Sequence, residues 1–136
     1  MKKLIAVLLG AVLLLAACAP ASDSFNEAVE NLQATAEASF SYAEIIGDES
    51  SVTMYLSDYG LGQEVENLRA LGYGPDQKDW MYVKDLLIST WNVVTNYFED
   101  CGFQNVQLHI IVVDDRDENT ILLTVVDGVV AYDCLA

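Results

Sequence analysis

The sequence predicts an α+β domain in which an antiparallel sheet, made of one hairpin and a three-strand meander, packs on one long helix. Residues 51–56 and 106–113 alternate with the period of two that a half-buried strand has. Asp127-Gly128, between two apolar runs, is a typical two-residue hairpin turn. Between residues 76 and 99, large apolar residues recur at steps of three and four, the spacing of one helix face: Trp80, Val83, Leu87, Trp91, Val94 and Phe98.

The first third of the chain predicts a weak helix and then a hairpin. Residues 20–38 are small and acidic, and their few larger apolar residues recur at a heptad-like spacing that favours a weak amphipathic helix opened by Ser22, Asp23 or Ser24. The same segment can also serve as a spacer. Residues 40–46 and 51–56 read as two strands joined at Gly47-Asp48. We therefore expect a tether or weak helix at residues 18–38, ahead of a single α+β domain at residues 39–136.

The middle of the chain predicts two helices. A short one runs from about Gln63 to Leu71 and stops at Gly72, and the loop that follows has no phosphate-binding pattern. The long one is capped by Asp76 or Asp79 and ends before Gly102. Two tryptophans on one stripe can form a surface platform for sugar rings. Because Val and Leu residues lie between them on that stripe, core packing is the favoured interpretation.

The last third returns to strands. Val106, Leu108, Ile110 and Val112 share one face of a strand, and His109 lies on the other face. An acidic turn at residues 114–119 leads to strands at residues 120–126 and 129–134, joined by the hairpin turn. Because strands are grouped on either side of the helices, an α+β class with an antiparallel sheet is expected.

The N-terminus has the order of a secretory signal peptide. Lys2 and Lys3 precede an apolar run that ends in Leu15-Ala16-Ala17-Cys18. These four residues resemble the lipobox of bacterial lipoproteins. The resemblance implies cleavage of a signal peptide at residues 1–17 and a covalent diacylglycerol on Cys18. An uncleaved membrane helix is the alternative, but polar residues from Pro20 onward end the run short of the 20 or so residues that a span needs.

A lipobox also implies where the protein resides. The mature chain would stay at the extracytoplasmic face of the cell membrane, held by fatty acyl chains of the palmitate type. Two acyl chains make such anchoring stable, whereas one makes it reversible.

Strong acidity limits the possible partners. The chain has 6 basic and 21 acidic residues, for a formal net charge of −15. Cleavage after residue 17 removes two basic residues and no acidic one, so the mature chain carries −17. Such a field repels nucleic acids and anionic lipid head groups. Nucleic-acid binding is therefore not expected, and the acidity is explained by solubility.

Three cysteines divide into one plus two. If Cys18 carries lipid, Cys101 and Cys134 are left outside the cytoplasm, where disulfides persist, and we expect them to pair. The bond would close a 34-residue loop and stabilise the fold by about 3–4 kcal/mol in the chain-entropy model. In the alternative, both remain small buried thiols.

Residues suited to catalysis or metal binding are few. His109 is the single histidine and is expected on a partly wet sheet face, away from any nucleophile motif. The acidic turn fails the EF-hand template, because Thr120 and Val126 fall where Gly and Glu are needed. A solvated turn is favoured, and no catalytic residue, metal or cofactor is predicted. The turn supplies only weak candidates for a cation site, namely Asp114, Asp115, Asp117 and Glu118.

We expect a lipid-anchored extracytoplasmic binding module, non-catalytic, whose partner is a protein or a cell-wall component. A small Asp/Glu-dependent glycan hydrolase is the first alternative, because that chemistry needs only two suitably spaced acids. The second is an inhibitory or regulatory domain for an extracytoplasmic protease, suggested by likeness to cystatin-like and propeptide-like modules. Residues 120–133 also resemble small uncharacterised secreted domains of Gram-positive bacteria.

Overall fold

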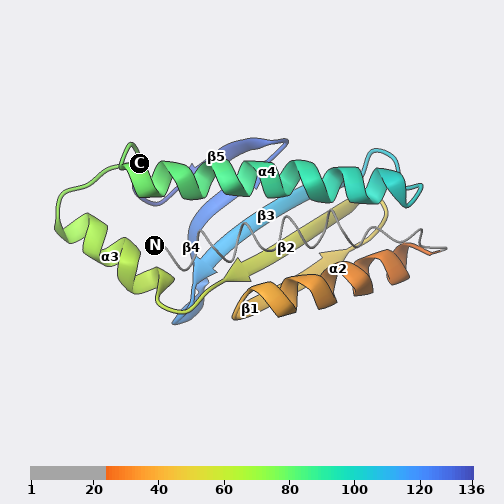
Figure 1. The fold of residues 1–136 in the computed structure, drawn as a ribbon, viewed down its shortest axis with the longest axis horizontal. Coiled ribbons are helices and arrows are strands. Elements are labelled where there is room, and N and C mark those ends of the chain that lie inside the picture. Colours follow the sequence, from red (N-terminus) through yellow and green to blue (C-terminus); the bar gives the residue numbers. More distant parts are fainter. Residues whose placement is uncertain (1–23) are drawn as a thin grey trace.

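The computed structural model describes residues 24–136 as three helices and five strands (Figure 1). In chain order these are α2 (Phe25–Ser39), β1 (Tyr42–Gly47), β2 (Ser51–Ser57), α3 (Leu61–Ala70), α4 (Lys78–Asp100), β3 (Gln107–Asp114), β4 (Asp117–Val126) and β5 (Val129–Asp133). The predicted α+β class, with one long helix on a sheet, is confirmed. In the part of the chain that the structure describes, no helix is both long and apolar enough to span a membrane.

The sheet is mixed, which corrects the expectation of a wholly antiparallel one. Its strand order is β1-β2-β3-β4-β5, and the pair β2–β3 is parallel. Along the chain, α3 and α4 connect β2 to β3. The 23 residues of α4 span about 34 Å at the usual helical rise, enough to carry the chain back along the sheet. Gln107 N–H then bonds Ser50 C=O at 2.9 Å, so β3 begins beside the start of β2 and must run parallel to it.

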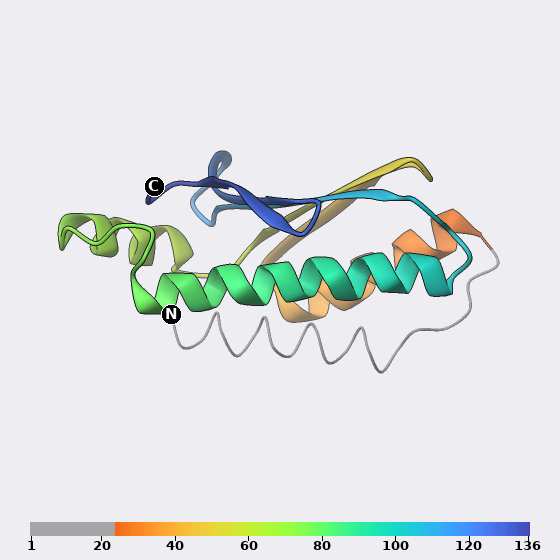
Figure 2. The ribbon, with the colours of Figure 1, turned by 90° about the horizontal axis from the view of Figure 1, so that it is seen from above.

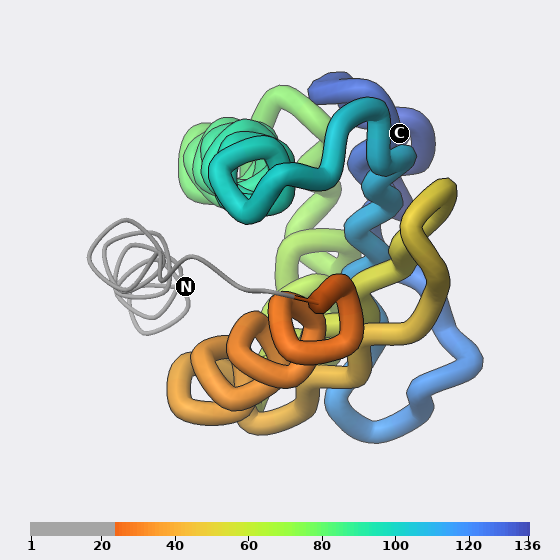
Figure 3. Tube along the Cα trace, turned by 90° about the vertical axis from the view of Figure 1, so that its right-hand side faces the viewer, coloured from red at the N-terminus to blue at the C-terminus, as the bar shows by residue number. Residues whose placement is uncertain are grey.

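Helices cover only one face of this sheet. Figure 2 shows α2 and α4 on one side, and Figure 3 shows the same two-layer arrangement along the sheet. The core between the layers includes the fully buried side chains of Leu32, Trp80, Phe98, Leu108 and Leu123. Among residues 24–136, no helix covers the opposite face of the sheet.

Helix α2 belongs to this core. Ser24 caps it by accepting a hydrogen bond from Glu27 N–H at 3.1 Å. Phe25 stacks on Phe98 with ring centroids 5.5 Å apart, and Tyr97 Oη donates to Ala28 C=O at 2.9 Å. The core therefore includes the buried residues of α2, and of the two alternatives for this segment, residues 25–39 form the helix and not the spacer. Residues 18–23 of the expected tether lie outside the described residues.

The same helix also closes one edge of the sheet. The side-chain amide of Gln33 donates to Ala43 C=O at 2.7 Å and accepts from Ile45 N–H at 2.8 Å. These are edge groups of β1 that would otherwise be open to another strand. Pairing of a foreign strand with β1 at this point is therefore blocked.

Helix α4 has the predicted buried stripe but a different cap. Gln77, and neither Asp76 nor Asp79, accepts the hydrogen bond from Trp80 N–H, at 2.8 Å. Trp91 is only half-buried, and its indole N–H donates to Leu108 C=O at 2.8 Å. Both tryptophans therefore hold the helix to the sheet, as the core-packing interpretation requires.

The predicted hairpin turns are both present. Asp127 and Gly128 have φ of 51° and 74°, the two positive values that a type I′ turn needs. In the first hairpin the Asp48 carboxylate accepts from Ser50 N–H at 2.9 Å and from Ser51 N–H at 3.1 Å. Local turn chemistry thus fixes both antiparallel hairpins.

Candidate functional site: the uncovered face of the sheet

The uncovered sheet face includes two rows of side chains that run across all five strands. Strand register places these residues opposite one another, pair by pair. The first row is Ile46, Thr53, His109, Val126 and Val129. The second row is Glu44, Tyr55, Ile111, Thr124 and Tyr132. At the usual strand spacing each row is about 19 Å long. We call these ten residues the open face.

The open face differs from the rest of the protein in its charge. Glu44 is its one carboxylate, and neither row holds a lysine or arginine. Aromatic, β-branched and hydroxyl side chains make up the remainder, together with His109. His109 is half-buried, as the sequence predicts, and its cross-strand neighbours are Thr53 and Val126. Neither neighbour is an acid or a thiol that could form a catalytic pair with the imidazole.

A polar hollow of about 330 Å³ lies beside the open face, where β3 passes into β4. Tyr42 lines it, and its hydroxyl donates to the Glu44 carboxylate at 2.9 Å. Desolvation and the acceptor carboxylates of Glu44 and Glu118 raise the pKa of Tyr42 to about 12. Tyr42 is therefore a hydrogen-bond donor at neutral pH and does not act as a base.

The acidic turn between β3 and β4 forms the other wall of this hollow. Asp114 accepts from Arg116 Nε at 3.1 Å and Nη2 at 3.0 Å, and mainly this contact lowers the pKa of Asp114. Asp115 accepts from Gly60 N–H at 3.0 Å and Gly62 N–H at 2.9 Å, at the N-terminus of α3. A carboxylate there stabilises the helix through its dipole.

The other two acids of this turn are also engaged. Asp117 accepts from Thr120 Oγ1 at 2.6 Å, which lowers the pKa of Asp117, and Glu118 interacts with the Tyr42 hydroxyl. Within residues 24–136 no three His, Cys, Asp or Glu side chains are grouped so that they could hold a metal ion. The turn thus organises loops, and the weak cation candidates do not converge on one point.

Cys101 and Cys134 are not joined by a disulfide, which corrects the expected pairing. Cys101 follows the last turn of α4. Cys134 follows Asp133, whose carboxylate accepts from the indole of Trp80 in the first turn of the same helix. The two cysteines therefore lie near opposite ends of a helix about 34 Å long. A disulfide needs Cα atoms within about 7 Å.

We expect both cysteines to remain thiols in protein purified under air. Alkylation with iodoacetamide without reductant should modify Cys101 and Cys134 in the denatured chain, and the intact mass should equal that of the fully reduced chain. Burial raises the pKa of the Cys134 thiol, so its alkylation in the native state should be slow at neutral pH. A mass about 2 Da lower, with a peptide linking the two residues, would show that the described geometry is wrong.

A partly buried polar network that the sequence pattern does not reveal anchors the C-terminal segment. The Asp133 carboxylate accepts from Trp80 Nε1 at 2.9 Å, Lys84 Nζ at 2.8 Å and Leu135 N–H at 2.9 Å. Nearby, Arg69 Nη2 donates to Cys134 C=O at 2.9 Å. Two of the four basic residues within residues 24–136, Arg69 and Lys84, therefore hold residues 133–135 in place.

Comparison of the chain with protein-family models, with curated proteins and with solved structures found no match. Cys18 and the lipobox lie outside the described residues.

Proposed function

We propose that this chain is a lipid-anchored extracytoplasmic binding module, without catalysis of its own, that presents the open face of its sheet to a ligand. The observation that carries the proposal is a five-stranded sheet whose second face is covered by none of the helices in the described part of the chain. The ten residues of the open face include two tyrosines and two threonines, and Glu44 is their one charged side chain. Proteins use exposed patches of this composition for binding.

The start of α2 suits a lipid anchor at Cys18. Ser24 is six positions after Cys18, and six residues of extended chain reach about 20 Å. The domain would then stay close to the membrane while its acidic surface is repelled by anionic head groups. This supports attachment through acyl chains, with the folded surface left accessible.

The engaged acids favour binding over hydrolysis. A glycosidase needs two carboxyl groups about 5–9 Å apart that face a common cleft. The carboxylates of Asp114, Asp115 and Asp117 are instead committed to Arg116, to the start of α3 and to Thr120. No contact of this turn favours the hydrolase or the protease-inhibitor alternative.

Metabolic labelling with an alkyne analogue of palmitate, in a bacterial host, tests the anchor. The wild-type chain should incorporate the label, and its N-terminal peptide should begin at Cys18 with the mass of a diacylglycerol. Cys18→Ser should lose both signals, because the thiol is the site of modification. Cys134→Ser is the matched control and should keep them. Unlabelled wild-type protein, or cleavage at another residue, would contradict the proposed anchoring.

A further inference from the structure

We infer that the ligand of the open face is a neutral, hydroxyl-rich glycan chain. The inference rests on the proposed function, because it names the ligand class for the same face. Its first support is the chemistry of the two rows. Tyr55 and Tyr132 offer aromatic surface to the apolar side of a sugar ring, and Thr53, Thr124 and His109 offer hydrogen bonds to hydroxyl groups.

Shape supports the same ligand class. The central side chains of both rows are half-buried by their neighbours, whereas Tyr132 at the edge is 50% exposed. The result is a broad, shallow surface that crosses five strands, and the hollow lined by Tyr42 lies to one side of it. An extended chain can contact such a surface along its whole length, whereas a compact ligand normally needs a concave pocket.

Charge distinguishes a neutral polymer from two competing occupants, an anionic polymer and a second copy of this acidic chain. Acids flank the open face at three places: Asp48 and Glu49 in the β1–β2 turn, Glu118 at the start of β4, and Asp127 in the β4–β5 turn. Polymers that carry phosphate or carboxylate groups would be repelled by these flanks. A second copy of this chain would bring the same acids against them. A neutral glycan meets neither penalty.

The binding test uses the chain from residue 19 onward, so that its outcome does not depend on lipidation. The described core runs from Phe25 to Leu135 and is intact in that chain. Chitohexaose, cellohexaose, mannohexaose and maltohexaose are the neutral probes, titrated by calorimetry and NMR at physiological salt. Oligogalacturonate is the anionic probe and the chitosan hexamer the cationic one.

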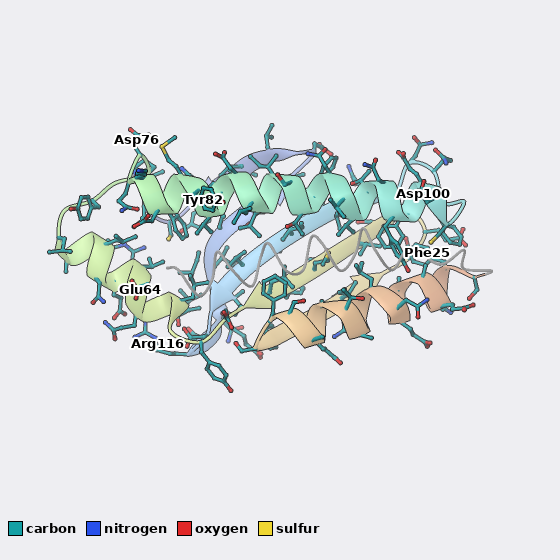
Figure 4. All side chains as sticks on the ribbon, viewed as in Figure 1. Phe25, Glu64, Asp76, Tyr82, Asp100 and Arg116 are labelled. Carbon is teal, nitrogen blue, oxygen red and sulfur yellow. The ribbon has the colours of Figure 1, made fainter. Side chains whose placement is uncertain are left out.

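At least one neutral hexasaccharide should bind with a Kd of about 1 mM or lower, a weak but specific affinity. Oligogalacturonate should not bind, and any chitosan binding should disappear in high salt. Tyr132→Ala should weaken neutral binding about tenfold. Tyr82→Ala is the matched control, because Tyr82 is 47% exposed but lies on α4 in the helical layer (Figure 4), and it should leave the affinity unchanged.

Three results would overturn the inference: no binding of any neutral probe, binding of the chitosan hexamer alone, or equal loss of affinity in Tyr132→Ala and Tyr82→Ala. Light scattering adds a fourth. A dimer that Thr124→Asp dissociates, while Asn92→Asp on the exposed side of α4 does not, would show that a second copy covers the face. None of these results bears on lipidation at Cys18, so failure of the ligand class and failure of the anchor can be told apart.

Discussion

Replacing Trp80 by alanine is expected to lower the free energy of unfolding by about 3–5 kcal/mol. The Trp80 side chain is 0% exposed and lies in the first turn of α4, where the helix meets the end of β5. The substitution leaves a large cavity and also removes the indole N–H from the Asp133 carboxylate. Urea denaturation followed by circular dichroism measures the change, with an unchanged slope showing that the same surface unfolds.

Two further variants show which part of Trp80 matters. Trp80→Phe keeps most of the ring and loses the N–H donor, so it should cost less than Trp80→Ala. Trp91→Ala should also cost less, because Trp91 is half-buried and contacts the hairpin turn at Gly128. If Trp91 were as fully buried as Trp80, the two alanine variants would lose equal amounts of unfolding free energy. A near-neutral Trp80→Ala would contradict the described core.

Elements whose signals are local could be predicted from the sequence. The helical stripe of α4, the alternation in β2 and β3 and the Asp127-Gly128 turn each depend on neighbours within a few residues. For the same reason the α+β class followed from the order of these elements. The cap of α4 is Gln77, whereas the sequence predicts Asp76 or Asp79, because glutamine is a less common cap than aspartate.

Features that depend on distant parts of the chain could not be predicted. The parallel pair β2–β3 is set by the length of the α3–α4 crossover, and periodicity within a strand carries no information about its neighbour's direction. The cysteine pairing was inferred from the number of cysteines and from the expected oxidising compartment. The separation of Cys101 from Cys134 instead depends on their positions near opposite ends of α4. Helix α2 looked weak because its buried residues include Ala28 and Ala36. Small side chains give little sequence signal, yet they allow close packing.

The candidate site shows the same limit. Sequence alternation predicts that His109 lies on a partly wet strand face, but it does not identify the residues beside it. The open face exists only because register aligns ten residues from five strands. The acids of the β3–β4 turn stood out in the sequence as a possible cation site. In the structure their partners are Arg116, the α3 N-terminus and Thr120, none of which a spacing rule identifies.

The second large effect is expected from the ion pair between Lys84 and Asp133. Their side chains are 16% and 8% exposed, and Lys84 Nζ also donates to Pro75 C=O at 2.9 Å. Lys84→Met keeps the aliphatic stem but leaves the Asp133 carboxylate without its cation. Because an uncompensated buried charge is costly, the variant should lose about 3 kcal/mol at pH 7.

Lys78→Met is the matched control, since it removes the same charge from an exposed position at the start of the same helix. Its effect on the free energy of unfolding should stay within about 0.5 kcal/mol. If Lys84→Met is as mild as Lys78→Met, the ion pair does not stabilise the fold.

The effect of Lys84→Met should depend on pH in a defined direction. Burial raises the pKa of Asp133, but hydrogen bonds from Lys84, Leu135 N–H and Trp80 outweigh it, so the folded-state pKa lies below the ordinary value. A carboxyl group with a lowered folded pKa contributes stability above its unfolded pKa of about 3.9 and loses it as pH falls through the folded value. Wild type and Lys84→Met should therefore differ most at pH 7 and converge below about pH 4, where the carboxylate becomes protonated. Urea titrations between pH 7 and pH 3 measure this convergence, and a difference that stays constant over the range would show that the Asp133 charge is not what Lys84 stabilises.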